Sequence, residues 1–248
     1  MPFKQARLLS IPYSIYPTGD HAISVSFGNE INVATNEKIM ALFHQLKSTK
    51  INGVKDIIPA YTTLTIVYDI ENIKKQTHLS AYTWIHEKLV HLLNTTESKP
   101  LHNTCIEIPV CYDVVFGIDL PVMAAQKKMH VEEIIQIHAS TQYHVYMLGF
   151  LPGFAYMGTV DNRIATARIT TPRTNVAAGS VGIAGNQTGI YPIDSPGGWN
   201  IIGRTPLLLF NVHKENPCLL QPGHKVKFVP VNKDEFEYIK LQHEHPHH

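Results

Sequence analysis

The chain has 248 residues, of which 44% are hydrophobic and 17% charged, and its formal net charge is +1. This composition is typical of one large or two modest globular domains and gives no electrostatic reason to expect nucleic-acid or membrane binding. No apolar run approaches the roughly 20 residues that span a bilayer, and the N-terminus lacks the apolar core of a secretory signal, so we expect a cytoplasmic protein.

The first hundred residues alternate between strand-like and helix-like patterns. Two segments alternate apolar and polar side chains, as half-buried strands do, and two repeat apolar side chains at helical spacing. The strand-like segments are residues 22–27 and 62–68, and the helix-like segments are residues 36–47 and 80–93. Thr35 or Asn36 is a candidate cap for the first helix, and Ser80 for the second. This order predicts a small α/β domain over residues 1–100, with helices packed on a sheet.

A polar stretch without periodicity, residues 94–103, is predicted to be the boundary to a second domain, residues 101–248. Residues 105–111 are predicted to form a strand, and residues 119–128 and 131–139 two helices. After Tyr143 the chain consists of short apolar runs broken by glycine and proline, which indicates a β-barrel or sandwich. The histidine-rich end, from about residue 240, is predicted to be disordered.

Residues 148–206 form a segment rich in glycine and proline. Ten of the fifteen glycines and five prolines fall within these residues. Large apolar side chains such as Phe154 and Trp199 are interleaved with these residues, which a flexible linker would not contain. The pattern therefore predicts a compact, loop-rich surface of defined shape, and such surfaces commonly carry function.

Three ordered motifs in this segment resemble the signature of the allophanate hydrolase subunit 1 family. They are GFLPGFAYMG from Gly149, PRTNVAAGSVGIAGNQTGIYP from Pro172 and SPGGWNIIGRTP from Ser195. Residues 19–22, GDHA, and residues 106–113, IEIPVCYD, are similar to the family's N-terminal strand and mid-chain segment. The resemblance covers about residues 12–230. Ala155 and Ala177 stand at positions where the family pattern often has proline.

The resemblance implies an α+β protein in which a small α/β N-terminal domain precedes a cyclophilin-like β-barrel domain. The family includes the B subunit of bacterial ATP-dependent 5-oxoprolinase, a ring-amide hydrolase that converts 5-oxo-L-proline to L-glutamate only with its partner subunits. It also includes KipI, a non-enzymatic inhibitor of a sensor histidine kinase. The first role implies a subunit 2 partner of the KipA/PxpC type, an A-subunit protein and the use of ATP by the complex. The second implies a sensor histidine kinase as partner. The shared motifs do not separate the two roles, and we take the role in the enzyme as the first hypothesis.

Several self-sufficient catalytic motifs are missing from the sequence. There is no P-loop, no dinucleotide-binding fingerprint, no H-E-x-x-H and no G-x-S-x-G. The three cysteines have no metal-ligand spacing, so no metal site is expected. No ATP site is evident either, which favours a chain that acts only within a complex.

Polar side chains inside the glycine- and proline-rich segment are the remaining candidates. Arg173 and Arg204 lie beside flexible backbone, where a guanidinium is suited to bidentate binding of a carboxylate or phosphate. Alternatively, each arginine ties loops together through backbone carbonyls. Ser180 lies near Gly179 and Gly182, so it could stabilise an oxyanion or simply bond to its own turn.

His138, at the end of a predicted helix, could act as an acid or base, or be a hydrogen-bonded core residue. Tyr191 and Asp194 flank Pro192 and could orient a polar substrate or cap a turn. We therefore predict two catalytic residues, His138 and Ser180, and four substrate-binding residues, Arg173, Tyr191, Asp194 and Arg204.

Overall fold

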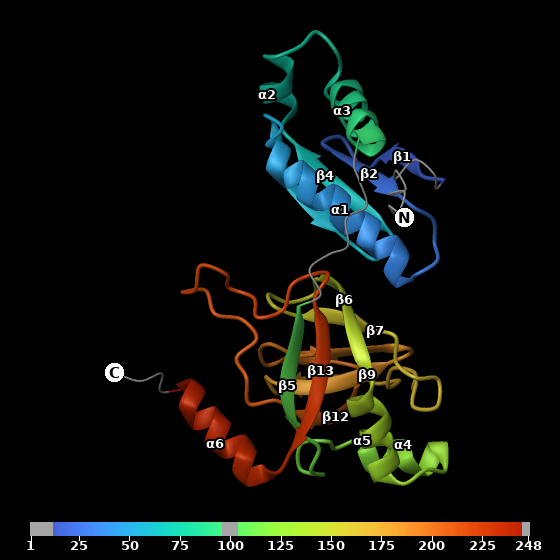
Figure 1. Cartoon of the computed structure of the whole chain (residues 1–248), viewed down its shortest axis with the longest axis vertical. Helices are drawn as coiled ribbons and strands as arrows, with labels where there is room; N and C mark the ends of the chain where they lie inside the picture. Colours follow the sequence, from blue (N-terminus) through green and yellow to red (C-terminus); the bar gives the residue numbers. More distant parts are fainter. Residues whose placement is uncertain (1–11, 96–103, 245–248) are drawn as a thin grey trace, which may run out of the picture. The chain divides into compact units, whose positions relative to one another are not determined.

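The computed structural model describes residues 12–95 and 104–244 (Figure 1). The chain divides into two compact units, Met1–His102 and Asn103–His248. Separate clusters of buried apolar side chains fill the two units. The first unit is a sheet with helices and the second contains a closed barrel, so the predicted α+β fold class is confirmed.

The first unit is a four-stranded antiparallel sheet in the order β1-β2-β4-β3, covered by helices. Its elements are β1 (Ser14–Pro17), β2 (Ala22–Ser26), α1 (Val33–Thr49), β3 (Val54–Pro59), β4 (Thr63–Tyr68), α2 (Ile70–Lys74) and α3 (Ala81–Thr95). Side chains alternate along β4, so Leu64 and Ile66 are fully buried against Ile39 of α1 and Leu89 of α3. This apolar layer forms the core of the unit.

Helix α1 begins three residues before the predicted start at Asn36. Asn32 is its cap, because its side-chain oxygen accepts a hydrogen bond from the Thr35 backbone N–H at 2.8 Å. The Asn36 side chain instead donates to the carbonyls of Ala60 and Tyr61. The predicted Ser80 cap of α3 is confirmed by the bond from the Thr83 N–H to its hydroxyl.

The second unit is built on a closed seven-stranded barrel in the order β10-β7-β6-β13-β5-β12-β9. Its elements are β5 (Cys105–Cys111), α4 (Leu120–Lys127), α5 (Val131–Ser140), β6 (Gln142–Leu148), β7 (Ala155–Gly158), β8 (Arg173–Val176), β9 (Ser180–Ala184), β10 (Gln187–Ile190), β11 (Ser195–Gly197), β12 (Asn200–Arg204), β13 (Lys225–Val231) and α6 (Lys233–Glu244). Neighbouring strands are antiparallel except β5 and β13, which pair in parallel. Strands β8 and β11 form a separate two-stranded ribbon.

Two apolar clusters stabilise the barrel unit. The larger fills the barrel interior, with fully buried side chains such as Val145, Ile183 and Phe228. The smaller is an aromatic group of Phe154, Tyr191 and Trp199 within the glycine- and proline-rich segment. Helices α4 and α5 lie together at one end of the barrel (Figure 1). The segment therefore forms barrel strands and the loops between them, which gives its residues a rigid base.

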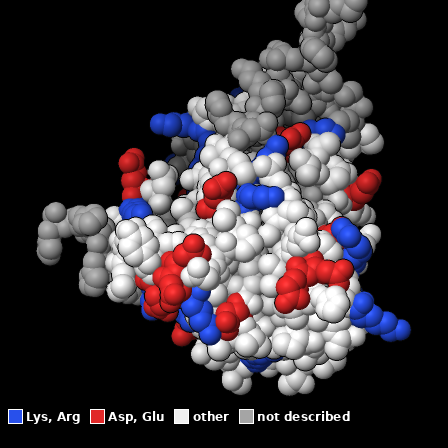
Figure 2. Space-filling view, turned by 60° about the horizontal axis from the view of Figure 1, so that its bottom comes forward, with Lys and Arg blue, Asp and Glu red and all other residues white. Residues whose placement is uncertain are grey.

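The surface at the end of the barrel unit that carries α4 and α5 has charges of both signs. Figure 2 shows acidic and basic side chains interspersed on this face, with wide uncharged areas between them. This face therefore offers no broad basic surface of the kind that nucleic acids bind. Across the described ranges, no helix is both long enough and apolar enough to cross a membrane. Within the same ranges, no group of three or more His, Cys, Asp or Glu side chains could hold a metal ion.

The C-terminal segment differs from the prediction of disorder from about residue 240. Helix α6 continues to Glu244, and its start is fixed by reciprocal bonds between Asn232 and Glu235 at 2.9 Å. Residues 245–248 lie outside the described residues. Most of the predicted boundary also lies outside them, since the structure is described to Thr95 and again from residue 104.

We expect the barrel unit to fold without the first unit, because each has its own apolar core. A fragment of residues 103–248 should be monomeric, show dispersed amide resonances and unfold cooperatively. An insoluble fragment, or one with collapsed amide dispersion, would show that the two units need each other to fold.

Candidate functional site

A pocket of about 240 Å³ lies on the barrel unit beside strands β8, β9 and β12. Val115, Phe116 and Ile118, from the loop after β5, contribute apolar side chains to its lining. Arg204 and Ser180 contribute polar groups to it. We call this site the Arg204 pocket. Three of the predicted site residues, Arg173, Ser180 and Arg204, line it together.

Arg204 ends strand β12 opposite Ser180 of β9. Its Nε donates to the Ala178 carbonyl at 2.7 Å, and its guanidinium carbon lies 6.0 Å from the centre of the Phe116 ring. No described residue accepts a hydrogen bond from its terminal nitrogens. These two nitrogens are therefore available to a ligand, and their fork-shaped arrangement is suited to binding an anion with two hydrogen bonds.

The backbone beneath Arg204 requires glycine. Gly179 has a φ of +82°, and a Cβ there would lie 2.4 Å from the Thr205 carbonyl oxygen. The Gly179 N–H donates to the Tyr191 carbonyl at 2.7 Å, and the Thr205 N–H donates to the Gly179 carbonyl at 2.9 Å. This close approach of two backbone segments explains one of the glycines in the segment and sets the position of Arg204.

Arg173 lines the same pocket, but its guanidinium is already paired. Its Nη2 bonds to Asp119 Oδ1 at 2.6 Å, and its Nη1 donates to the Trp199 carbonyl at 3.3 Å. The other carboxylate oxygen of Asp119 accepts the Ile201 N–H at 2.6 Å. Arg173 therefore ties loops together, as the alternative interpretation of the sequence proposed, while Arg204 keeps a free edge.

Sequence reasoning missed Asp119, a buried residue at the start of α4. Changing Asp119 to Asn would leave the Arg173 charge without its partner, so we expect the free energy of unfolding to fall by about 2 kcal/mol. Chemical denaturation measures this loss. Asp161→Asn is the matched control, because Asp161 pairs with Arg163 at the exposed surface. Equal stability of the two variants would contradict a role for Asp119 in holding the pocket.

Ser180 is 5% exposed and lies at the start of β9. Its backbone N–H donates to the Ala177 carbonyl at 3.1 Å, and no described residue hydrogen-bonds to its hydroxyl. Among the residues that the structure describes, no carboxylate or imidazole lines the Arg204 pocket. Without such a base the hydroxyl is suited to donating a hydrogen bond to a ligand rather than to nucleophilic attack.

His138 does not reach the pocket, and its predicted catalytic role is not supported. It is 0% exposed inside the barrel, where its ring stacks on Phe228 with centroids 4.5 Å apart. Its Nδ1 lies 2.8 Å from the Tyr112 hydroxyl and its Nε2 3.0 Å from the Thr188 hydroxyl. Thr188 donates its own proton to the Gly182 carbonyl, so Nε2 carries the imidazole hydrogen and Nδ1 accepts from Tyr112. The fixed, neutral ring fits the alternative of a hydrogen-bonded core histidine.

Burial lowers the pKa of His138 from 6.5 to about 3, and burial also lowers the pKa of His144 to about 4. The unfolded chain therefore takes up these protons first as the pH falls. The stabilisation that comes from keeping these two imidazoles neutral is fully present above pH 6.5. It is lost as the pH falls toward their pKa values in the folded protein. The neutral His138 contributes on the order of 5 kcal/mol to this pH-dependent stability.

Denaturation of the barrel unit at a series of pH values below 6.5 checks this expectation. His138→Gln removes one titrating group and should give a shallower loss of stability with falling pH. The same slope in both proteins would show that His138 is not held neutral.

Tyr191 and Asp194 shape the loop beside Arg204 rather than lining its pocket. Tyr191 is buried in the aromatic cluster, with its ring centroid 5.4 Å from that of Phe154. Asp194 accepts the Ala178 N–H at 2.7 Å, and the carbonyl of Ala178 is the one that Arg204 bonds. Asp194 thus fits the turn-capping alternative. It fixes the loop on which the position of Arg204 depends.

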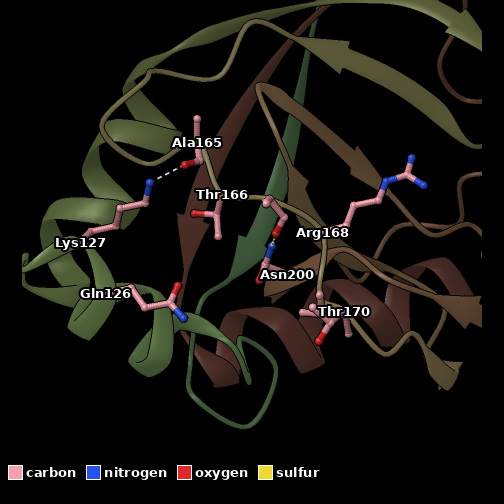
Figure 3. A pocket seen from close by; sticks show the side chains of 9 residues that line it. Gln126, Lys127, Ala165, Thr166, Arg168, Thr170 and Asn200 are labelled. Atoms are coloured by element: carbon pink, nitrogen blue, oxygen red, sulfur yellow. Dashed lines mark hydrogen bonds between the residues drawn. The ribbon is translucent and has the colours of Figure 1, made fainter.

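A second and larger pocket, of about 510 Å³, lies between the end of α4 and residues 165–170 (Figure 3). Gln126, Lys127 and Asn200 complete its lining. None of these residues was predicted as a site residue, because they belong to no recognisable motif. We call this site the Lys127 pocket.

Comparisons with known proteins agree with the motifs. The family model for the carboxyltransferase domain, subdomain C and D, matches residues 13–220. A Bacillus subtilis protein named as the B subunit of 5-oxoprolinase is 39% identical over 241 residues, which cover 94% of this chain and 98% of that protein. A protein of the same name from Escherichia coli O157:H7 is 36% identical over 215 residues, covering 87% and 94%.

Solved structures show the same fold. The crystal structure of TTHA0988 superposes with a TM-score of 0.74 at 34% identity, covering 85% of this chain and 40% of that one. PH0987 from Pyrococcus horikoshii is 41% identical, with a TM-score of 0.53 and coverage of 90% and 100%. The chain thus spans nearly all of the two 5-oxoprolinase proteins but less than half of TTHA0988. As the motif resemblance predicted, this chain belongs to the family of carboxyltransferase subdomains C and D that includes proteins named as the B subunit of 5-oxoprolinase.

Proposed function

We propose that this chain is the B subunit of a 5-oxoprolinase complex, which uses ATP to open 5-oxo-L-proline to L-glutamate. The supporting observation is its similarity, over nearly the full length, to proteins that carry this name. No such observation favours the alternative of a kinase inhibitor. A reaction that consumes ATP also fits the cytoplasmic location expected from the sequence.

The Arg204 pocket is the proposed place for the substrate. Its volume of about 240 Å³ is ample for a small ring acid. The free edge of the Arg204 guanidinium would bind the carboxylate, and the Ser180 hydroxyl would donate to the ring carbonyl. The ring carbons would pack against Val115, Phe116 and Ile118. The chain would thereby orient the substrate for reaction.

Ring opening adds water across the amide C–N bond, with the nitrogen leaving as an amine and the carbonyl becoming a second carboxylate. Amide resonance makes this step slow, so coupling to ATP is chemically reasonable. The described residues that line the Arg204 pocket include no general base, and the sequence contains no P-loop. The activation and hydrolysis steps are therefore proposed to need partners, namely a subunit 2 protein of the KipA/PxpC type and an A-subunit protein.

Co-expression with these two partners tests the proposal. The chain should elute with the subunit 2 protein in size-exclusion chromatography, because specific interfaces bury more than about 1,000 Å². The complete complex should release glutamate from 5-oxo-L-proline only when ATP is present. Separate elution at micromolar concentration, together with no ATP-dependent glutamate from the mixture, would refute the assignment.

A further inference from the structure

The charged side chains that line the Lys127 pocket, Lys127 and Arg168, are both basic. Gln126 and Lys127 come from the end of α4, and Asn200 from the start of β12, with residues 165–170 completing the wall. Figure 3 shows Gln126 and Lys127 facing Thr166, Thr170 and Asn200 across an open space. None of the described residues that line the pocket is Asp or Glu, so a basic side chain here is not neutralised within the pocket.

Asn200 presents an acceptor without a partner. Its side-chain nitrogen donates to the Ala167 carbonyl at 2.8 Å and to the Ile183 carbonyl at 3.1 Å. Both partners are acceptors, so the amide can be oriented only with its nitrogen toward them. No described residue donates to its Oδ1, although Asn200 is only 7% exposed. An acceptor without a partner on a mostly buried side chain in a pocket wall is a site for a ligand N–H or O–H.

Lys127 supplies the charge. Its ammonium donates to the Ala165 carbonyl, which fixes the side chain, and its other hydrogens remain available. Among the ion pairs of the described residues, none involves Lys127. Arg168 has a different role, because its guanidinium lies over the Trp199 ring and extends away from Gln126 and Lys127 in Figure 3. Lys127 is therefore the cation that a ligand would meet.

We infer that the Lys127 pocket is a second binding site, for a small carboxylic acid that also carries an N–H or O–H donor. The ligand carboxylate pairs with Lys127, and its donor bonds to Asn200 Oδ1. The Thr166 hydroxyl already donates to the Ile164 carbonyl at 3.0 Å, so it offers the ligand a second acceptor, and the Thr170 hydroxyl and the Gln126 amide are placed to complete the contacts. The inference stands on the pocket's own groups and does not depend on the proposed function.

Amide chemical-shift mapping of the full chain with 5-oxo-L-proline, L-glutamate and acetate tests the inference. The two acids with a donor should shift the amides of residues 126–127 and 165–170, and acetate should bind at least about tenfold more weakly, as loss of one hydrogen bond predicts. Lys127→Met should weaken binding of the two acids by about tenfold or more. Lys128→Met is the matched control, because Lys128 lies next in the chain but does not line the pocket.

The mapping on the wild-type chain decides the matter even if Lys127→Met does not fold. Absence of shifts in residues 126–127 and 165–170 at millimolar ligand would overturn the inference. Shifts confined to residues around Arg204 would also overturn it, while supporting the Arg204 pocket as the substrate site. Equal affinity for acetate would remove the role given to Asn200.

Discussion

Replacement of His138 with alanine is expected to lower the free energy of unfolding of the barrel unit by about 3–5 kcal/mol. The imidazole is fully buried and stacks on Phe228, so its removal leaves a cavity in the barrel interior. The Tyr112 hydroxyl, which donates to Nδ1, also loses its acceptor. Chemical denaturation followed by circular dichroism measures the effect.

An exposed histidine is the control for this change. His213→Ala should leave stability nearly unchanged, because His213 lies in an exposed loop. The opposite pattern for His138, with normal stability but no turnover in the reconstituted complex, would restore the catalytic role predicted from the sequence.

The sequence could place His138 on a helix but not identify its partners. The apolar face formed by Val131, Ile134 and Ile135 favoured a core residue, and the structure agrees. Tyr112 and Thr188, however, lie 26 and 50 residues away in the chain. Only barrel closure brings them to the ring, and local patterns do not encode such pairings.

Strands with strict alternation were predicted well, whereas less regular ones were not. Residues 105–111 were predicted as a strand and form β5 with the same bounds. Strand β3, Val54–Pro59, was missed because it carries Lys55 and Asp56 side by side and ends in proline, as edge strands can. The parallel pairing of β5 with β13 joins segments about 120 residues apart, beyond the reach of periodicity.

The candidate site was also only partly predictable, because local patterns mark some of its residues and distant segments supply the others. The glycine- and proline-rich segment drew attention to Arg173, Ser180 and Arg204, which line one pocket. Asp119 and the apolar loop after β5 come from outside that segment, and nothing local marks them as neighbours of Arg173. Such partners decide whether the guanidinium nitrogens of an arginine are available to a ligand. The sequence alone therefore could not show that Arg204 is a better candidate for substrate binding than Arg173.

Replacement of Arg204 with lysine is expected to lower kcat/KM of the reconstituted complex for 5-oxo-L-proline by about 10- to 100-fold. Lysine keeps the positive charge but loses the planar fork that would hold the substrate carboxylate with two hydrogen bonds. Loss of such a contact costs about 1.5–3 kcal/mol, and about 1.4 kcal/mol corresponds to tenfold in rate. Tm should change little, because a lysine ammonium can still donate to the Ala178 carbonyl that Arg204 bonds now.

Arg173→Lys is the matched comparison, because it makes the same substitution at the pocket's other arginine. Lysine can satisfy Asp119 or the Trp199 carbonyl, but it cannot reproduce the two bonds in the geometry that Arg173 has. We therefore expect Arg173→Lys to lower Tm more than Arg204→Lys does. Measuring Tm and kcat/KM on the same samples separates loop support from substrate binding. Unchanged kcat/KM in Arg204→Lys would remove this pocket from the reaction, because no other described cation in its lining has a free guanidinium edge.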